Sequence, residues 1–240
     1  MNRAGSSGCR PLCILSGIVL SSLAAFTLCG CSTVVGSGPT TLVRVIDAAY
    51  NSPALDAYVS ATPIAVNFGG PSISNYAFLP PAVATIKITP TGKSTALAQL
   101  SGTLEVSQQH TVYITGQGTD FQVTLLTDQS MAAPAGSFAV RFLQQAIATG
   151  AVDIYFVPDG TKIAAAKPVL SGLAPGTVTA YTNIPAGTYD LVVVPAGTTT
   201  NPYTSAATAF NSGQVNTMLI VDQQLLNTPP INVLVADDVN

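Results

Sequence analysis

Two short stretches in the first half of the chain recur in the second half and decide the fold. Residues 43–45 (VRV) and 54–59 (ALDAYV) return as residues 140–142 (VRF) and 151–156 (AVDIYF). Both stretches are displaced by the same 97 residues, so the distance between them is the same in each copy. Self-similar motifs at a fixed period indicate a duplicated structural unit.

Further matches extend this duplication along the chain. At an offset of 105, four positions correspond: Tyr76, Pro80, Pro90 and Gly92 match Tyr181, Pro185, Pro195 and Gly197. Thr111 then matches Thr217, and residues 125–128 match residues 234–237. The offset grows only between motifs, as expected for insertions in loops. We therefore predict these segments: a signal peptide at 1–30, a flexible tether at 31–40, a first repeat at 41–130, a linker at 131–137 and a second repeat at 138–240.

Strand signals dominate both copies, and turn residues separate them at short intervals. In the first copy we expect strands near 42–47, 54–60, 73–79, 83–89, 97–105, 110–117 and 120–127. In the second copy we expect them near 138–144, 151–157, 176–183, 188–194, 204–210, 215–222 and 231–236. Residues 191–194 (LVVV) do not alternate, which predicts burial on both faces or packing against the other domain. A short helix is expected near residues 163–166. The fold class predicted is all-β, with two tandem immunoglobulin-like antiparallel β-sandwich domains.

The composition excludes several classes of protein. Charged residues make up 8% of the chain, with 8 Lys and Arg against 11 Asp and Glu, and 48% of residues are hydrophobic. The charged share is well below the roughly 25% of average soluble proteins. Intrinsic disorder is disfavoured because it requires low hydrophobicity and high charge. Nucleic-acid binding is disfavoured because it requires clustered basic residues.

The N-terminal segment carries the features of a secretory signal. Arg3 and Arg10 precede an apolar run at residues 12–28, and residues 28–32 read LCGCS. This stretch resembles the bacterial lipoprotein signal: Leu28, Gly30 and Cys31 match it, and Cys29, a less usual residue there, stands at the position of its small residue. The resemblance implies that the Cys31 thiol receives a diacylglyceryl group. An ordinary cleaved signal and an uncleaved membrane helix are the alternatives.

Cleavage before Cys31 has consequences for the rest of the chain. The other cysteines leave with the signal, so we expect no disulfide, no zinc thiolate and no cysteine nucleophile in the mature protein. Two of the eight basic residues also leave, so six basic residues remain against eleven acidic ones. Acylation then has to anchor the protein without a basic patch. Ser32 favours sorting to the outer membrane, where the protein would face the periplasm or the surface.

A recurring Arg and Asp are the most prominent polar pair. Arg44 and Asp56 are twelve residues apart, as are Arg141 and Asp153. If the two strands that carry them lie side by side, each pair forms a structural ion pair. The alternative is that Asp56 and Asp153 bind a ligand or Ca²⁺. However, neither lies among the closely spaced carboxylates of a calcium loop.

Other candidate groups offer weaker signals. His110 is the sole histidine, and Asn216 stands at its place in the second copy. A catalytic triad would need His110 with Asp120 or Asp128 as its orienting carboxylate. The adjacent Asp237 and Asp238 could attract a cation, although a solvated chain end is the simpler interpretation. We expect no cofactor and no metal site.

The repeated motifs resemble a bacterial envelope family, domain of unknown function 4397, whose members often occur in tandem. Its signature is Val-Arg-x-x-His-Ala-Ser-Pro-Asp-Ala-Pro-x-Val-Asp-Val-Tyr, with a later Pro-Ala-Gly-x-Tyr strand. The first copy matches at Val43, Arg44, Ala48, Pro53, Asp56 and Tyr58. The second matches at Val140, Arg141, Val152, Asp153, Tyr155 and residues 185–189. Asp47 and Gln144 replace the signature His, which speaks against any metal or catalytic task at that position.

The resemblance implies a fold and a location rather than a reaction. We therefore predict a non-catalytic, lipid-anchored protein of the cell envelope that acts as a structural or interaction module. Its expected partners are the membrane, through Cys31, and an envelope protein or glycan. The alternatives are a secreted hydrolase that uses Asp56, Asp153 or His110, and an envelope sensor.

Overall fold

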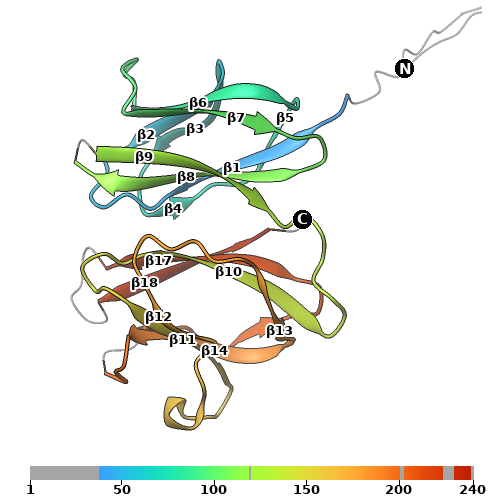
Figure 1. The fold of residues 1–240 in the computed structure, drawn as a ribbon, viewed down its shortest axis with the longest axis vertical. Coiled ribbons are helices and arrows are strands. Elements are labelled where there is room, and N and C mark those ends of the chain that lie inside the picture. The colour runs from blue at the N-terminus through green and yellow to red at the C-terminus, as the bar shows by residue number, and fades with distance from the viewer. Residues whose placement is uncertain (1–37, 119, 201–202, 224–229, 239–240) are drawn as a thin grey trace, which may run out of the picture. The chain divides into compact units, whose positions relative to one another are not determined.

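Each half of the chain forms a β-sandwich (Figure 1). The structure is a computed structural model that describes residues 38–118, 120–200, 203–223 and 230–238. The predicted signal peptide, Cys31 and most of the predicted tether lie outside these residues. Within the described ranges, no helix combines the length and the apolar character needed to cross a bilayer.

The first sandwich consists of two sheets, which we call inner and outer. Its inner sheet contains β1 (Thr41–Asp47), β4 (Ser72–Ile73), β5 (Ala77–Leu79), β8 (Gln109–Gln117) and β9 (Asp120–Asp128). Its outer sheet contains β2 (Leu55–Val59), β3 (Thr62–Phe68), β6 (Ala82–Pro90) and β7 (Ala98–Leu104).

The second sandwich repeats this arrangement. Its inner sheet contains β10 (Ser137–Gln145), β13 (Thr182–Pro185), β17 (Val215–Asp222) and β18 (Ile231–Asp237). Its outer sheet contains β11 (Val152–Pro158), β12 (Leu170–Leu173), β14 (Gly187–Pro195), β15 (Tyr203–Thr204) and β16 (Thr208–Phe210).

The strand order is the same in both sandwiches. The inner sheets run β4-β1-β8-β9 and β13-β10-β17-β18, and the outer sheets run β3-β2-β6-β7 and β12-β11-β14-β15. The predicted all-β sandwich class is confirmed. One pairing in each inner sheet departs from the antiparallel expectation, because β1 runs parallel to β8 and β10 runs parallel to β17.

The central strands of the inner sheets are buried on both faces. In β1, Val43 and Val45 point into the core of the first sandwich, while Ile46 points to the opposite face, where it meets the second sandwich. Successive side chains of a strand alternate between faces, so a strand covered on both sides reads as a continuous buried run. All eight residues of β17 are buried for the same reason.

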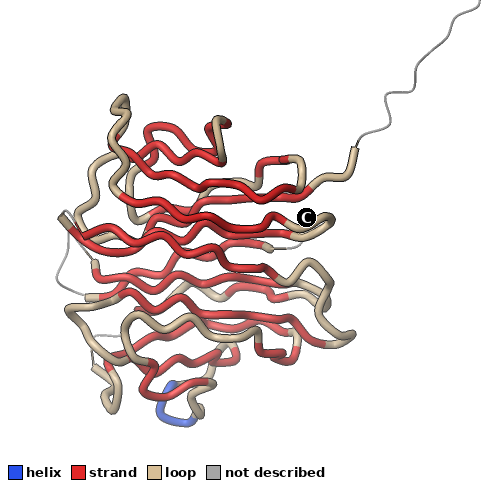
Figure 2. Tube along the Cα trace, turned by 45° about the horizontal axis from the view of Figure 1, so that its top comes forward, coloured by secondary structure: helices blue, strands red, loops and turns tan. Residues whose placement is uncertain are grey.

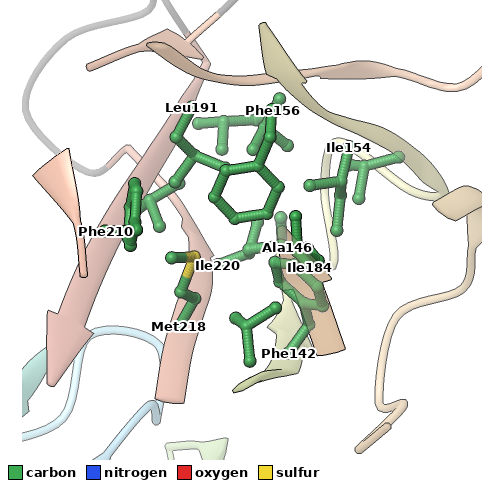
Figure 3. Close-up of a cluster of buried hydrophobic side chains, with 14 of the residues drawn as sticks. Phe142, Ala146, Ile154, Phe156, Ile184, Leu191, Phe210, Met218 and Ile220 are labelled. Atoms are coloured by element: carbon green, nitrogen blue, oxygen red, sulfur yellow. The ribbon is translucent and has the colours of Figure 1, made fainter. Parts of the chain in front are cut away.

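The core of the second sandwich is rich in aromatic side chains (Figure 3). The rings of Phe138 and Phe210 stack at 4.6 Å, and the edge of Phe156 meets both of them at 5.2 and 5.3 Å. Such stacked and edge-to-face pairs add to the stabilisation that comes from burial alone.

A separate apolar cluster joins the two inner sheets. Ile46 and Tyr113 of the first sandwich pack in this cluster with Leu143, Leu219 and Val221 of the second. The four sheets are therefore stacked in the order outer, inner, inner, outer, and Figures 1 and 2 show these layers.

Two strands escaped the sequence analysis, and both are edge strands. β3 contains Pro63, and β12 contains Gly172 with a φ of 64°. Proline and glycine weaken a strand signal, yet both are tolerated where a strand has a neighbour on one side only. In the predicted strand at 176–183, only the last two residues belong to a strand, β13.

The short helix expected near residues 163–166 is present as a 3-10 turn, η1 (Ile163–Ala165), drawn in blue in Figure 2. Ile163 and Ala166 pack against Val192 and Val194, on the outer face of the second sandwich. On the other face, Leu191 and Val193 belong to the sandwich core. Residues 191–194 are therefore buried on both faces, as predicted, and the cover comes from within the same sandwich.

Candidate functional site

A cluster of charged side chains lies buried where the two inner sheets meet. Arg44 projects from β1 and Arg141 from β10, on the faces that turn toward the other sandwich. They are 1% and 2% exposed. Each arginine forms its closest ion pair with an aspartate of the other sandwich: Arg44 with Asp238, and Arg141 with Asp128. Both carboxylates are fully buried.

Arg44 uses all three guanidinium nitrogens. Nη2 donates to Asp238 Oδ1 at 2.5 Å and to Thr217 Oγ1 at 3.1 Å. Nε donates to Thr111 Oγ1 at 2.9 Å, and Nη1 donates to the Asp237 carbonyl at 3.4 Å. Three of these four acceptors belong to the second sandwich.

Arg141 makes the corresponding contacts in reverse. Nε donates to Thr217 Oγ1 at 2.9 Å, and Nη2 donates to Thr111 Oγ1 at 3.3 Å and to Asp128 Oδ1. Nη1 donates to the Thr127 carbonyl at 3.4 Å. The two arginines thus exchange partners across the interface, and two positive charges meet two negative ones.

Two tyrosines complete the cluster. The guanidinium of Arg44 lies 4.8 Å from the ring centre of Tyr76, and that of Arg141 lies 5.0 Å from the ring centre of Tyr181. Tyr76 donates its hydroxyl proton to Asp128 at 2.6 Å, and Tyr181 donates to Asp238 at 2.6 Å. Burial raises the pKa of both tyrosines, which keeps the hydroxyls protonated as donors.

Burial and neighbouring charges act in opposite directions on the pKa values of this cluster. Burial alone would lower the pKa of Arg44, but Asp238, Tyr76 and Asp128 together outweigh it, and the net shift is upward. Burial raises the pKa of Asp238, and Arg44 acts against this rise. Asp238 accepts from Arg44, Thr217 and Tyr181, which is the pattern of an ionised carboxylate surrounded by donors.

The chemistry open to this cluster is structural. Both carboxylates already accept hydrogen bonds, and both arginines form ion pairs. Burial separates these four side chains from bulk solvent. In the part of the chain that the structure describes, no three His, Cys, Asp or Glu side chains are grouped as metal ligands. The cluster can fix the orientation of one sandwich on the other, because removing a partner would leave a buried charge uncompensated.

The predicted pairs Arg44–Asp56 and Arg141–Asp153 are wrong. They assumed that the two strands of each motif lie side by side, but β1 belongs to the inner sheet and β2 to the outer sheet. The same separation holds for β10 and β11. The arginines face the other sandwich, and the two aspartates lie elsewhere.

Asp56 and Asp153 each hold an edge strand and a turn together. Asp56 accepts from the backbone N–H groups of Asn67 and Gly92 at 2.9 and 3.0 Å. Asp153 accepts from those of Gly172 and Gly197 at 2.7 and 2.9 Å. Hydrogen bonds to the charged form, led by that from Asn67, lower the pKa of Asp56.

The position of the signature His also serves a loop. Asp47 accepts from the Ala49 backbone N–H at 2.9 Å and from the Ser52 hydroxyl at 2.7 Å. Burial raises the pKa of Asp47. In the second sandwich, Gln144 accepts from the Ala146 N–H at 2.7 Å and donates to the Gly150 carbonyl at 2.6 Å. Two different side chains thus close the same turn.

His110 is buried at the start of β8, where it accepts from the Glu105 N–H at 3.3 Å. Burial lowers its pKa. Asp56 lies where β1 has ended and β2 begins, at the opposite end of the first sandwich. Asp120 pairs with Gln117 at the far end of β8. The structure therefore does not bring together the His and Asp residues of a triad that includes Asp120.

Sequence reasoning missed Asp128 and Asp238 as the partners of the arginines. It matched residues 125–128 with residues 234–237, and thus Asp128 with Asp237. In the strand register, Asp128 lies opposite Gln109, and Asp238 lies opposite Val215, the corresponding residue of the second sandwich. Asp128 therefore corresponds to Asp238, one residue further along the chain. A slip of one residue turns a strand side chain to the other face. The repeated Tyr76 and Tyr181 were a usable signal, since both lie within the cluster. Asp238 is also not a solvated chain end, because it is fully buried.

Hollows open beside the contact between the sandwiches. One of about 280 Å³ is lined by Arg44, Ile73, Ser74, Asn75, Tyr76, Val235, Ala236 and Asp237. Another, of about 340 Å³, lies near the opposite ends of β1 and β10, against Tyr50, Thr149 and Asp222. There the Asp222 carboxylate accepts hydrogen bonds from the backbone N–H groups of Ala148 and Thr149 and from the Thr149 hydroxyl.

One known protein family matches a part of the chain that begins in the first sandwich. Residues 41–155 match the model of a family described as Domain of unknown function (DUF4397). The match begins with β1 and ends within β11, so it covers the first sandwich and the two strands that carry Arg141 and Asp153. No curated protein matches the chain. By this match, residues 41–155 belong to the DUF4397 family.

Proposed function

We propose that this protein is a non-catalytic, lipid-anchored module of the cell envelope, whose double sandwich presents its loops and sheet faces to an envelope protein or glycan. The anchor is supported by residues 28–32, which resemble a lipoprotein signal, and by the Ser- and Gly-containing segment that follows them. Acyl chains on Cys31 give stable membrane attachment without a basic patch.

The observation that carries the non-catalytic part is the use of the buried polar groups. Arg44 and Arg141 hold the carboxylates of Asp238 and Asp128 across the interface. Asp56 and Asp153 are engaged as well, because each accepts a backbone N–H group from an edge strand and another from a turn. Groups that a hydrolase would need free are thus engaged in holding strands and loops in place.

The geometry favours this proposal over a hydrolase. Such an enzyme would use Asp56, Asp153 or His110, but Asp153 lies in the other sandwich, and Asp56 and His110 lie at opposite ends of the first. A catalytic pair must lie within hydrogen-bond reach of one substrate. An envelope sensor would share the same anchor and fold, and no contact in the structure favours it.

Mass spectrometry of the N-terminal peptide tests the anchor. In a bacterial host we expect Cys31 to carry a diacylglyceryl group and the protein to sediment with membranes. The variant Cys31→Ala should lose both properties, whereas the matched control Cys29→Ala should keep them. An unmodified Cys31 in a correctly exported protein would overturn the anchor.

The non-catalytic proposal is tested separately with Asp56→Asn, Asp153→Asn and His110→Asn. We expect these variants to change stability only. Any turnover that one of them abolishes while the fold remains intact, judged by circular dichroism, would refute the proposal.

A further inference from the structure

Three large apolar side chains are exposed at one end of the first sandwich. Phe78 in β5, Val83 in β6 and Val106 after β7 are 75%, 77% and 53% exposed. We call these three residues the apolar end. Scattered exposed apolar residues are ordinary on protein surfaces, whereas several at the same end of one domain suggest a contact made by that end.

Strand register places all three near the end of the first sandwich at which β1 begins. Phe78 lies in the inner sheet and Val83 in the outer sheet, and each points away from the core, because Leu79 and Ala84 next to them belong to it. Phe78 pairs with Leu42, the second residue of β1. Val106 precedes Ser107, whose N–H donates to the Thr40 carbonyl at 2.9 Å. Val83 pairs with Thr103, next to the end of β7 that leads into Val106. Figure 1 shows the β5–β6 turn and the β7–β8 connection on the same side as the start of β1.

The second sandwich shows that the fold does not require apolar residues at these places. The same registers assign Asn183 to the position of Phe78, Thr188 to that of Val83 and Ser212 to that of Val106. These three polar residues are also exposed. The apolar character is therefore particular to the sandwich that follows Cys31 in the chain.

The chain reaches this end directly from the proposed lipidation site. Thr40 lies nine residues after Cys31, and an extended chain of that length spans about 30 Å at most. Acylation of Cys31 would hold the start of β1 within that distance of the bilayer surface. Residues 38–42 and 77–83 include no ionisable side chain, and residues 104–108 include only Glu105. The partner that fits is therefore the apolar part of a lipid interface rather than an anionic surface.

We propose that the apolar end inserts into the interfacial region of the leaflet that holds the acyl chains. The first sandwich would then contact the membrane through this end. This inference rests on the proposed lipid anchor. The acyl chains supply the attachment, and Phe78, Val83 and Val106 set the orientation of the double sandwich on the surface.

A single tryptophan can report this contact, because the natural chain contains no Trp. The acylated protein with Phe78→Trp is reconstituted into phosphatidylcholine vesicles, and quenching of the indole fluorescence by bromine-labelled lipid is measured. The matched control is Asn183→Trp, at the same place in the second sandwich. We expect quenching in the Phe78→Trp variant to exceed that in the Asn183→Trp variant by about threefold or more, because insertion brings only the apolar end among the acyl chains.

Flotation of the same vesicles separates the two proposals. If the protein floats with the vesicles and the two tryptophans are quenched equally, the insertion of the apolar end is wrong and the anchor stands. If the protein exported by a bacterial host carries no lipid on Cys31 and does not float when mixed with vesicles, the anchor itself is wrong.

A second variant tests the apolar end without a reporter. Phe78→Asn, Val83→Thr and Val106→Ser together give the first sandwich the residues of the second, so we expect the fold to be retained. Transfer of the acylated protein between vesicles should become about tenfold faster, because apolar area is lost from the interface. A control with Val66→Thr, in the edge strand β3, should transfer at the natural rate. An unchanged rate in the triple variant would contradict the proposal.

Discussion

The side chain of His110 illustrates what burial does to a single titratable residue in this fold. It is 2% exposed, and burial lowers its pKa, although Asp128 and Glu105 act in the opposite direction. The unfolded chain therefore binds a proton at a higher pH than the folded one. Stability from this residue is full above the unfolded pKa of about 6.5 and falls as the pH drops toward the folded pKa.

We predict that replacing His110 with Asn, the residue that the second sandwich has at this place, removes this pH dependence. Urea unfolding at several pH values between 5 and 8 should show the wild-type free energy of unfolding falling faster on acidification than that of His110→Asn. Asp47 titrates in both proteins, so the difference between the two curves isolates the histidine. Parallel curves would show that His110 titrates normally in the folded chain.

Individual residues were recognised from the sequence, but their partners were not. The repeat identified Arg44, Arg141, Tyr76 and Tyr181 as special positions, and all four lie in the buried cluster. The pairing with Asp56 failed because local spacing cannot show which sheet a strand joins. Asp238 is 194 residues from Arg44 in the chain, a separation at which only the fold brings them together.

Among the elements, the β8–β9 hairpin depends on one glycine at its turn. Gly116 has a φ of 110°, and a Cβ at this position would lie 1.8 Å from the Asp120 carbonyl oxygen. Gly118, two residues further, has a φ of 63° with open space around it. A side chain at position 116 would therefore clash with the backbone, whereas one at position 118 would only strain its own backbone conformation.

We predict that Gly116→Ala destabilises the protein by about 3 kcal/mol or more, because the turn has to move. Gly118→Ala should cost about 1 kcal/mol, the strain of a left-handed alanine. Both values come from urea unfolding of the full mature chain. Equal losses for the two variants would mean that the hairpin adapts to a side chain at position 116.

Elements with a continuous or alternating apolar pattern were predictable, and the two edge strands β3 and β12 were not. The long strands β1, β8, β10 and β17 were expected within a residue or two of their observed bounds. β3 and β12 were missed because Pro63 and Gly172 interrupt their patterns while partners on one side still hold them. Edge pairing of this kind is decided by the neighbouring strand rather than by the strand's own sequence.

At the scale of the whole molecule, the two sandwiches share one interface that contains both an apolar cluster and the exchanged ion pairs. Opening this interface would expose Ile46, Leu143 and Leu219 and would leave charged groups without partners. We therefore predict that both sandwiches unfold in one transition. Hydrogen exchange in increasing urea should give β8 and β17 the same free energy of opening, whereas two well-separated values would show independent domains.

The most direct measurement is a double-mutant cycle across the interface. Arg44→Met and Asp238→Asn are made singly and together in the mature chain, and urea unfolding gives each free energy of unfolding. Arg44→Met alone should cost about 3–5 kcal/mol, because it leaves a buried carboxylate unpaired. The two changes should couple by about 1.5 kcal/mol or more, whereas Arg44→Met and Asp56→Asn should be additive. Additivity for Arg44 with Asp238, or strong coupling of Arg44 with Asp56, would contradict the exchange of partners between the sandwiches.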